Sequence, residues 1–312
     1  MKVVITGGAG FIGSNLARKL AADDHQVVIV DDCSTGLASN LDAIAGSVEL
    51  RVGSILDRSL LDEVFTDANA IVHLAALPSV PRSIEFPVET TNVNIIGTLN
   101  VLEACRANGR NPMVVHASSS SVYGAAPRMS RVETVRCEPM SPYAASKLAS
   151  EAYVLAYQTS YGLPAISFRF FNVYGPYQRP DHAYAPVVPN FVRAAQRGEP
   201  FVIHGDGEQT RDFTFVESVA STLAIAATQR RSHGTAVNLA FGTRTTINEL
   251  AFQVAAEMGV AATFDHRPPR VGDVRNSSAD SEVFRSLFPE VRAVALGEGL
   301  SQCINWLEHT RS

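Results

Sequence analysis

Near the N-terminus the sequence reads Val3-Val4-Ile5-Thr6-Gly7-Gly8-Ala9-Gly10-Phe11-Ile12-Gly13. Its first residues form the short β-branched run that a buried parallel strand uses. The glycines at 7, 10 and 13 then lead into a helical pattern from Ser14 to Ala22. Between a strand and a helix, such a loop turns backbone N–H groups toward a pyrophosphate. A plain structural turn is the alternative, and the flanking elements make it the weaker one.

The second predicted strand, residues 26–30, ends in Asp31. A carboxylate about twenty residues past the glycine loop accepts hydrogen bonds from the adenosine ribose and repels a 2′-phosphate. The residues from Asp32 to Gly36 include no arginine that could bind that phosphate. We therefore expect NAD rather than NADP as the cofactor.

Strand and helix patterns alternate along the first half of the chain. Strands are predicted near 48–52, 70–74, 112–116 and 165–171, and helices near 56–65, 94–108 and 143–157. This alternation predicts an α/β protein with a Rossmann-type doubly wound parallel sheet. The small, proline-containing segment 75–81 suits a loop beside a cofactor.

From Asn172 onward, frequent prolines suit the irregular loops of a smaller, mostly C-terminal α/β lobe. Helical patterns there lie near 189–197, 216–228, 247–258 and 296–309, and short strands near 214–215 and 236–239. We therefore expect an NAD-binding domain at 1–171, to which later segments such as 236–240 can return, and a substrate-binding lobe mainly at 172–312.

Strand 112–116 leads into Ala117-Ser118-Ser119-Ser120-Ser121-Val122-Tyr123-Gly124, which places hydroxyl groups where open parallel sheets bind ligands. Tyr143 and Lys147 follow, four residues apart and therefore on one helix face. An ordinary tyrosine is a poor base at neutral pH, and we expect the ammonium, with the positive nicotinamide ring, to lower the tyrosine pKa. A surface Tyr–Lys pair is the alternative. The stretch predicts a site that moves a proton on and off an alcohol.

Composition narrows the function classes. A net charge of -5 argues against a nucleic-acid surface. The four cysteines are widely spaced without a metal-ligand pattern, so we expect no metal and reduced thiols in a cytoplasm. We expect neither a signal peptide nor a membrane span. His73, at the end of an apolar strand, is expected to be a core histidine.

The glycine loop, the serine cluster, Tyr143-xxx-Lys147 and Arg169-Phe170-Phe171-Asn172-Val173-Tyr174-Gly175-Pro176 together resemble the extended short-chain dehydrogenase/reductase family. Within it, the chain resembles NAD-dependent nucleotide-sugar epimerases over nearly its whole length. The resemblance implies that Tyr143 takes a proton from the sugar, that Ser119 contacts the same hydroxyl, and that Lys147 binds the nicotinamide ribose. Family dehydratases carry Asp-Glu where this chain has Ser120-Ser121, which favours 4-epimerisation over 4,6-dehydration.

The resemblance also implies how a UDP-sugar is held. Asn172 and Arg211 match residues at the diphosphate, and Arg270 and Asp273 match residues at the nucleotide ribose and second phosphate. Strict UDP-galactose epimerases have a bulky aromatic residue where this chain has Ser277, and a small residue leaves room for a 2-acetamido group. Segments 79–84, 180–185 and 243–250 resemble the UDP-N-acetylglucosamine 4-epimerase branch, so UDP-GlcNAc/UDP-GalNAc is the first choice.

Alternatives remain open. Arg179 matches the position where UDP-glucuronate 4-epimerases hold the carboxylate, although those enzymes usually have Thr at the position of Asn172. UDP-glucose/UDP-galactose, a net dehydrogenase or reductase, and a non-catalytic NAD-binding regulator are the other candidates. Where many relatives have an Asp that bonds the adenine amino group, the chain has Ser54, which implies either weaker adenine anchoring or the use of Asp57.

The family also implies a homodimer built on helices 94–108 and 143–157. The expected cofactor contacts are Gly7, Gly10, Phe11, Ile12, Gly13, Asp31, Asp32, Ser34, Thr35, Gly36, Ser54, Ile55, Leu74, Ala75, Ala76, Asn94, Tyr143, Lys147 and Phe170. The expected substrate contacts are Pro78, Ser79, Ser119, Ser120, Asn172, Arg179, Ala185, Val187, Val188, Arg211, Arg270, Asp273 and Ser277.

Overall fold

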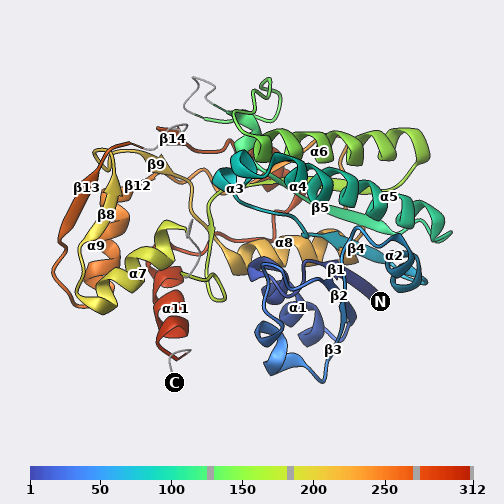
Figure 1. Ribbon diagram of the computed structural model, residues 1–312, viewed down its shortest axis with the longest axis horizontal. Coiled ribbons are helices and arrows are strands. Elements are labelled where there is room, and N and C mark those ends of the chain that lie inside the picture. Colours follow the sequence, from blue (N-terminus) through green and yellow to red (C-terminus); the bar gives the residue numbers. More distant parts are fainter. Residues whose placement is uncertain (125–129, 181–185, 270–274, 310–312) are drawn as a thin grey trace.

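A parallel sheet organises the molecule in this computed structural model, which describes residues 1–124, 130–180, 186–269 and 275–309. Its seven strands lie in the order β3-β2-β1-β4-β5-β6-β11 (Figure 1). The strands are β1 (Lys2–Thr6), β2 (Gln26–Asp31), β3 (Val48–Val52), β4 (Ala70–His73), β5 (Met113–Ser119), β6 (Ala165–Phe170) and β11 (Val237–Leu239). The order changes direction between β1 and β4, where doubly wound sheets bind dinucleotides. The expected Rossmann-type fold is confirmed.

Helices cover both faces of this sheet (Figure 1). On one face pack α1 (Phe11–Ala22) and α8 (Val216–Thr228), and on the other α2 (Arg58–Phe65), α5 (Gly97–Ala107) and α6 (Pro142–Tyr161). Along β1, Val3 and Ile5 join the first core and Val4 joins the second. Alternating side chains of a strand point to opposite faces, so an unbroken apolar run is what a sheet covered on both sides requires.

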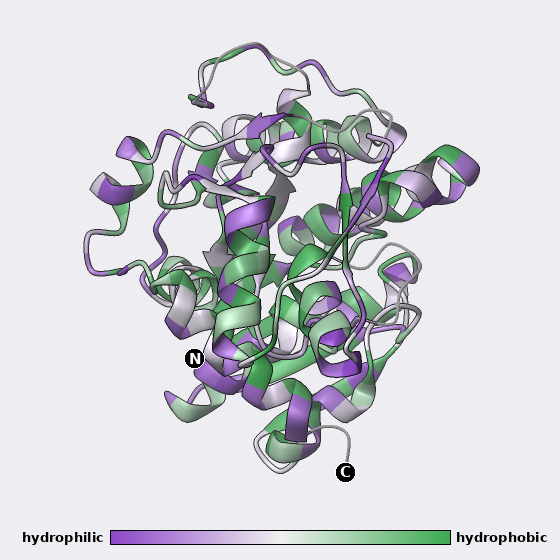
Figure 2. Cartoon of the chain, turned by 90° about the vertical axis from the view of Figure 1, so that its left-hand side faces the viewer, coloured by the Kyte–Doolittle hydropathy of each residue, from purple (hydrophilic) through white to green (hydrophobic). Residues whose placement is uncertain are grey.

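The second lobe has its own core, centred on phenylalanines and aliphatic residues such as Phe191, Phe201 and Leu250. Its helices are α7 (Val187–Arg197), α9 (Ile247–Glu257) and α11 (Leu296–His309). Its short strands are β7 (Val173–Tyr174), β8 (Phe201–His204), β9 (Thr210–Arg211), β10 (Thr214–Phe215), β12 (Thr245–Thr246), β13 (Phe264–Arg267) and β14 (Asn276–Ser277). Figure 2 shows hydrophobic residues concentrated where the elements pack together. Both α8 and β11 follow residue 172 but belong to the layers of the large sheet.

The structure differs from the predicted elements in several places. The segment expected as a loop through Pro81 ends earlier, because Ser79 caps α3 (Val80–Glu85), and α4 (Pro87–Thr91) follows. The helix expected from Asn94 opens with a π-helical turn, η2 (Asn92–Ile96). The pattern also missed β8, β13, α10 (Glu282–Leu287) and the 3-10 turns η1 (Ala38–Ile44) and η3 (Ser120–Tyr123). Short elements supply too few residues for a periodic signal.

Candidate active site

The glycine loop forms a tight cradle at the N-terminus of α1. Gly7 has a φ of +76°, and a Cβ there would lie 2.6 Å from the backbone nitrogen of Ala75. A Cβ at Gly13 would lie 2.2 Å from the Gly7 carbonyl oxygen. Gly10 is the N-cap and offers no side chain to the first backbone N–H groups of α1. A pyrophosphate fits this cradle, since anions bind the exposed N–H groups at a helix N-terminus.

Asp31 fixes the end of β2 against this loop. One carboxylate oxygen accepts a hydrogen bond from the Ala9 backbone nitrogen and the other from that of Cys33, both at 2.9 Å. The residue is only 7% exposed, and burial raises its carboxyl pKa. The carboxylate therefore stands beside the loop, in the place where the ribose of NAD would be held.

The other expected cofactor residues surround the same edge of the sheet. Leu74, Ala75 and Ala76 follow β4, Phe170 ends β6, and Ser34, Thr35 and Gly36 follow β2. A Cβ at Gly36 would lie 2.8 Å from the Ala9 backbone, so this segment folds over the glycine loop. Of the two adenine candidates, Asp57 caps α2 by accepting from Leu60, while the Ser54 hydroxyl accepts from Leu56. Asp57 is therefore partly engaged in holding its own helix.

The catalytic candidates Ser119 and Tyr143 meet at the carboxyl end of β5. Ser119 closes β5, and the Ser121 hydroxyl donates to its oxygen at 2.9 Å. Tyr143 lies in the first turn of α6, whose N-terminus is capped by Ser141 and opened by Pro142. The Ser119 and Tyr143 hydroxyls are hydrogen-bonded to each other, and this bond lowers the tyrosine pKa. Two residues far apart in sequence thus form a hydroxyl pair.

Lys147 lies one turn further along α6 and is 6% exposed. Its ammonium donates to the Ala117 carbonyl oxygen at 2.8 Å. Burial lowers the pKa of Lys147 to about 8. Burial in a medium that solvates charge poorly disfavours the ammonium, so this lysine is charged at neutral pH but close to its titration point.

The expected lowering of the Tyr143 pKa by Lys147 together with the nicotinamide ring stays a prediction, because it needs the bound cofactor. Burial raises the Tyr143 pKa, and the Ser119 hydrogen bond offsets only part of that rise. The ammonium makes its hydrogen bond to Ala117 instead. A tyrosinate near neutral pH therefore depends on the positive charge that a bound nicotinamide ring would add.

Two residues support α6 through hydrogen bonds that the sequence analysis did not predict. The buried Ser83 hydroxyl accepts from the Tyr143 backbone nitrogen at 3.0 Å, and so satisfies an N–H group at the start of α6. Asn94, expected at the cofactor, donates to the Ser146 hydroxyl at 2.9 Å and accepts from the Leu77 backbone at 2.8 Å. The π-helical turn thereby ties the loop after β4 to α6, which carries Tyr143 and Lys147. No local sequence signal reveals these long-range bonds.

The prediction for His73 is confirmed. Its two ring nitrogens are hydrogen-bonded to the hydroxyls of Thr6, at 2.7 Å, and Thr98, at 2.9 Å. Burial and the charge of Lys147 lower its pKa to about 3. Within the described residues, no group of three or more His, Cys, Asp or Glu side chains could hold a metal ion.

Two of the substrate candidates lie on the small three-stranded sheet of the second lobe. Arg211 on the central strand β9 pairs with Ser277 on β14 and Thr245 on β12. Asn172 lies just before β7, which runs parallel to β10, and its side-chain amide donates to the Asp212 carbonyl oxygen at 3.5 Å. The structure therefore brings Asn172, Arg211 and Ser277 into one region.

Asp212 joins these strands, although the sequence analysis gave it no role. Its buried carboxylate accepts from the backbone nitrogens of Gly242 and Ala279, at 3.0 and 3.1 Å. It also accepts from the backbone nitrogen and the hydroxyl of Thr243, at 3.2 and 2.8 Å. This carboxylate therefore sets the position of Arg211, its neighbour in the chain.

Other substrate candidates differ in what they offer. Val188 is buried in the core of the second lobe, whereas Val187 and Arg179 are half-buried. Ser79 is occupied as the α3 cap, and Pro78 before it is exposed. The expected contacts Ala185, Arg270 and Asp273 lie outside the described residues.

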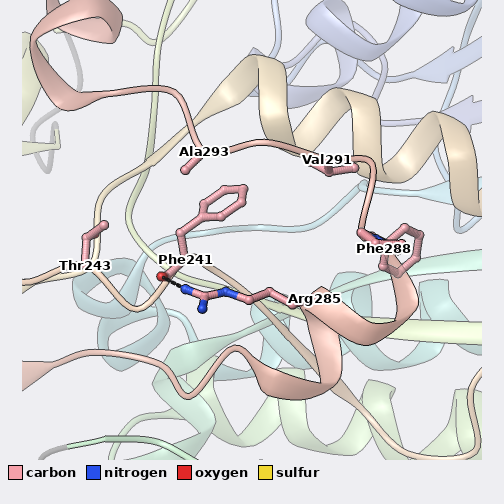
Figure 3. Close-up of a pocket in the computed structure, with 7 residues that line it drawn as sticks. Phe241, Thr243, Arg285, Phe288, Val291 and Ala293 are labelled. Carbon is pink, nitrogen blue, oxygen red and sulfur yellow. Dashed lines mark hydrogen bonds between the residues drawn. The ribbon is translucent and has the colours of Figure 1, made fainter.

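A separate cavity of about 450 Å³ lies beside α10 (Figure 3). It is lined by Phe241, Thr243, Arg285, Phe288, Pro289, Val291 and Ala293. Arg285 donates to the Phe241 carbonyl oxygen at 3.0 Å across its mouth. None of the candidate site residues lines it, so it is not the site that the sequence predicts.

Comparison with known proteins gives the family. Residues 3–240 match the NAD dependent epimerase/dehydratase family, and the chain belongs to it. It is 36% identical over 312 residues to a UDP-glucose 4-epimerase of Mycolicibacterium smegmatis, with 99% of each chain covered. The structure is similar to a UDP-N-acetylglucosamine 4-epimerase from Methanobrevibacter ruminantium M1 in complex with UDP-N-acetylmuramic acid, with a TM-score of 0.94, 34% identity and 99% and 98% coverage.

It is also similar to a UDP-glucose 4-epimerase of Thermus thermophilus in complex with NAD, with a TM-score of 0.89, 34% identity and 99% of each chain covered. The expected family and the NAD cofactor are thereby confirmed. The matches also support the expected enzyme class, an NAD-dependent nucleotide-sugar epimerase. None of the helices in the described ranges is long and apolar enough to cross a membrane.

Proposed function

We propose that this protein is a UDP-hexose 4-epimerase that inverts C4 through a 4-keto intermediate. The observation that carries the proposal is the hydroxyl pair of Ser119 and Tyr143, with Lys147 one turn away, at the same sheet edge as the glycine cradle. When bound, NAD supplies the acceptor for the C4 hydride and later its donor. A retained cofactor makes the net redox change zero.

The side chains divide the remaining work. Tyr143 accepts the proton of the C4 hydroxyl and returns it after the hydride has been restored on the other face. Ser119 donates a hydrogen bond at the reacting oxygen. Lys147 binds the nicotinamide ribose, and its charge acts together with that of the bound nicotinamide ring in favour of the tyrosinate. Asn172 and Arg211 keep the UDP in place while the keto-sugar turns over, since an Arg side chain suits phosphate oxygens.

For the sugar, we propose UDP-GlcNAc/UDP-GalNAc as the first pair. Ser277 supports this choice because it pairs with Arg211 in the substrate lobe and its small side chain leaves room for an acetamido group. The structural similarity to a UDP-N-acetylglucosamine 4-epimerase points the same way. UDP-glucose is the second candidate, because the Mycolicibacterium relative bears that name. UDP-glucuronate is the third, through the position of Arg179.

The test is to incubate purified protein separately with UDP-GlcNAc, UDP-glucose and UDP-glucuronate, without added NAD, and to follow C4 inversion. We expect inversion of at least the first, and a Tyr143→Phe variant should lose it. Tyr157→Phe is the matched control, because it lies on the same helix and its hydroxyl donates to Glu103 at 2.8 Å. Inversion of none of the three sugars would end the proposal, and stoichiometric NADH would favour a net dehydrogenase.

The sugar choice has its own test in Ser277→Tyr. The larger side chain should lower activity on the acetamido sugar more than on UDP-glucose. Equal losses on both would show that this position does not select sugar size.

We also propose a homodimer formed through the α5 and α6 region. Exposed apolar side chains support it, including Ile96 (45% exposed) and Tyr153 (41% exposed) on neighbouring helices. Ile96→Glu should shift the protein to monomers in size-exclusion chromatography with light scattering. Val202→Glu, at an exposed position on β8, is the control and should leave the mass unchanged. A cytoplasmic location stays a prediction from the cysteine spacing.

A further inference from the structure

Tyr177 connects the two lobes of the molecule. The guanidinium carbon of Arg18, on α1, lies 3.9 Å from the centroid of the Tyr177 ring. The ring of Trp306, on α11, has its centroid 5.1 Å from that of Tyr177. One side chain therefore contacts both the helix that follows the glycine loop and the last helix of the second lobe.

The backbone at this point is held in an unusual conformation. Tyr177 has a φ of +71°, a region that residues other than glycine seldom adopt. The adjacent Pro176 carbonyl oxygen accepts a hydrogen bond from the Asn15 side chain on α1 at 3.0 Å. Strained conformations persist where surrounding contacts fix them, and they are common at functional sites. Here the contacts of Arg18 and Asn15, both on α1, hold the Tyr177 backbone in its conformation.

The contacts of Arg18 continue to the glycine loop. Its guanidinium donates to the Asn40 carbonyl oxygen, and the buried Asn40 side chain donates to the Ala9 carbonyl oxygen at 2.9 Å. The Ala9 backbone nitrogen donates in turn to the carboxylate of Asp31. A continuous series of contacts thus runs from Tyr177 to the two features that fit NAD.

We propose that Tyr177 and Arg18 form a latch that slows the release of NAD. The segment around Asn40 and the glycine loop must move apart for a dinucleotide to leave, and the latch ties both to the second lobe. The catalytic cycle needs this, because a cofactor lost between the two hydride steps would leave the keto-sugar unreduced. The proposal depends on NAD binding, which the family establishes, and not on which sugar reacts.

The test measures NAD dissociation from the holoenzyme, by chasing bound labelled NAD with an excess of unlabelled NAD. Tyr177→Leu and Arg18→Met should each speed dissociation by about tenfold, as expected for the loss of a partly buried cation–π contact. Tyr177→Phe keeps the ring and should match the wild type. The double variant should release NAD no faster than the faster single variant, because both changes break one contact.

Arg231→Met is the matched control. Its guanidinium also lies over an aromatic ring, that of Phe288 at 5.3 Å, and donates to a backbone carbonyl, that of Leu287. These contacts are remote in the chain from α1 and the glycine loop, so this variant should release NAD at the wild-type rate. A wild-type rate in Arg18→Met overturns the latch, as does an equal acceleration in Arg231→Met. If Tyr177→Leu fails to fold, the NAD dissociation rates of Arg18→Met and Tyr177→Phe decide whether the latch exists.

Discussion

Replacing Lys147 with methionine should make the cofactor-free protein more stable while it abolishes catalysis. Burial lowers the Lys147 pKa from 10.5 to about 8, a fall worth roughly 3 kcal/mol. Below pH 8 the lysine is protonated in both the folded and the unfolded chain, so the full cost of the buried charge is present. Methionine removes this cost but leaves the Ala117 carbonyl oxygen without its donor, a loss of about 1–2 kcal/mol. The net gain near neutral pH is about 1–2 kcal/mol.

The change with pH in the stability difference between Lys147→Met and the wild type tests this explanation more directly. As the pH rises from about 8 to 10.5, the folded wild type releases the Lys147 proton before the unfolded chain does, and its stability increases. The advantage of Lys147→Met over the wild type should therefore shrink by roughly 2–3 kcal/mol over that range.

Urea denaturation of NAD-free protein at several pH values measures this difference, because bound NAD would stabilise the two proteins unequally. Lys2→Met is the matched control, since the Lys2 ammonium donates to the Thr66 carbonyl oxygen at 2.7 Å from an exposed position. Its stability relative to the wild type should stay constant with pH. A Lys147→Met advantage that does not change with pH, or a variant less stable at neutral pH, would refute the reasoning.

Three further predictions concern buried carboxylates. Asp31→Ser should lower the preference for NAD over NADP by about tenfold or more, because the charge that repels a 2′-phosphate is lost; equal dissociation-constant ratios would contradict this. Glu151→Gln should destabilise the fold by about 3–5 kcal/mol in urea denaturation, because it leaves the buried guanidinium of Arg169 without its counter-ion, which in the wild type lies 2.6 Å away. A loss of stability below about 1 kcal/mol would contradict this prediction. Asp212→Asn should weaken UDP binding about tenfold in calorimetry, by displacing Arg211, and leave NAD binding unchanged; weakened NAD binding would indicate a general loss of structure.

Local signals were enough to predict the sheet, and they also carry the proposed catalytic residues. The glycine loop, Asp31 and the spacing of Tyr143 and Lys147 each lie within one strand–turn–helix unit, so short-range sequence rules describe them. The long-range contacts were not predictable in this way. Ser83 reaches the backbone of Tyr143 across 60 residues of sequence, and no pattern marks a serine for that task.

The Tyr143 pKa shows why the spacing of residues in the sequence cannot by itself give the electrostatics of a site. The sequence reveals that an ammonium lies one helical turn away, but not that Lys147 is buried and hydrogen-bonded to Ala117, or that Tyr143 is half-buried. Burial raises the tyrosine pKa, and the hydrogen bond with Ser119 acts in the opposite direction. Electrostatic effects depend on solvent exclusion, which is a property of the packed structure.

The histidines His73 on β4 and His116 on β5 add no positive charge beside the buried Lys147 ammonium. His73 and His116 lie with ring centroids 5.7 Å apart, and His116 is hydrogen-bonded to the Ser167 hydroxyl at 2.8 Å. Burial and the Lys147 charge lower the pKa of His73 to about 3 and that of His116 well below its usual value. Both rings are therefore neutral near pH 7 and do not repel the ammonium. A protonated histidine here would lower the Lys147 pKa further and discharge it. Changes in activity near pH 8 should accordingly report Lys147 and not the histidines.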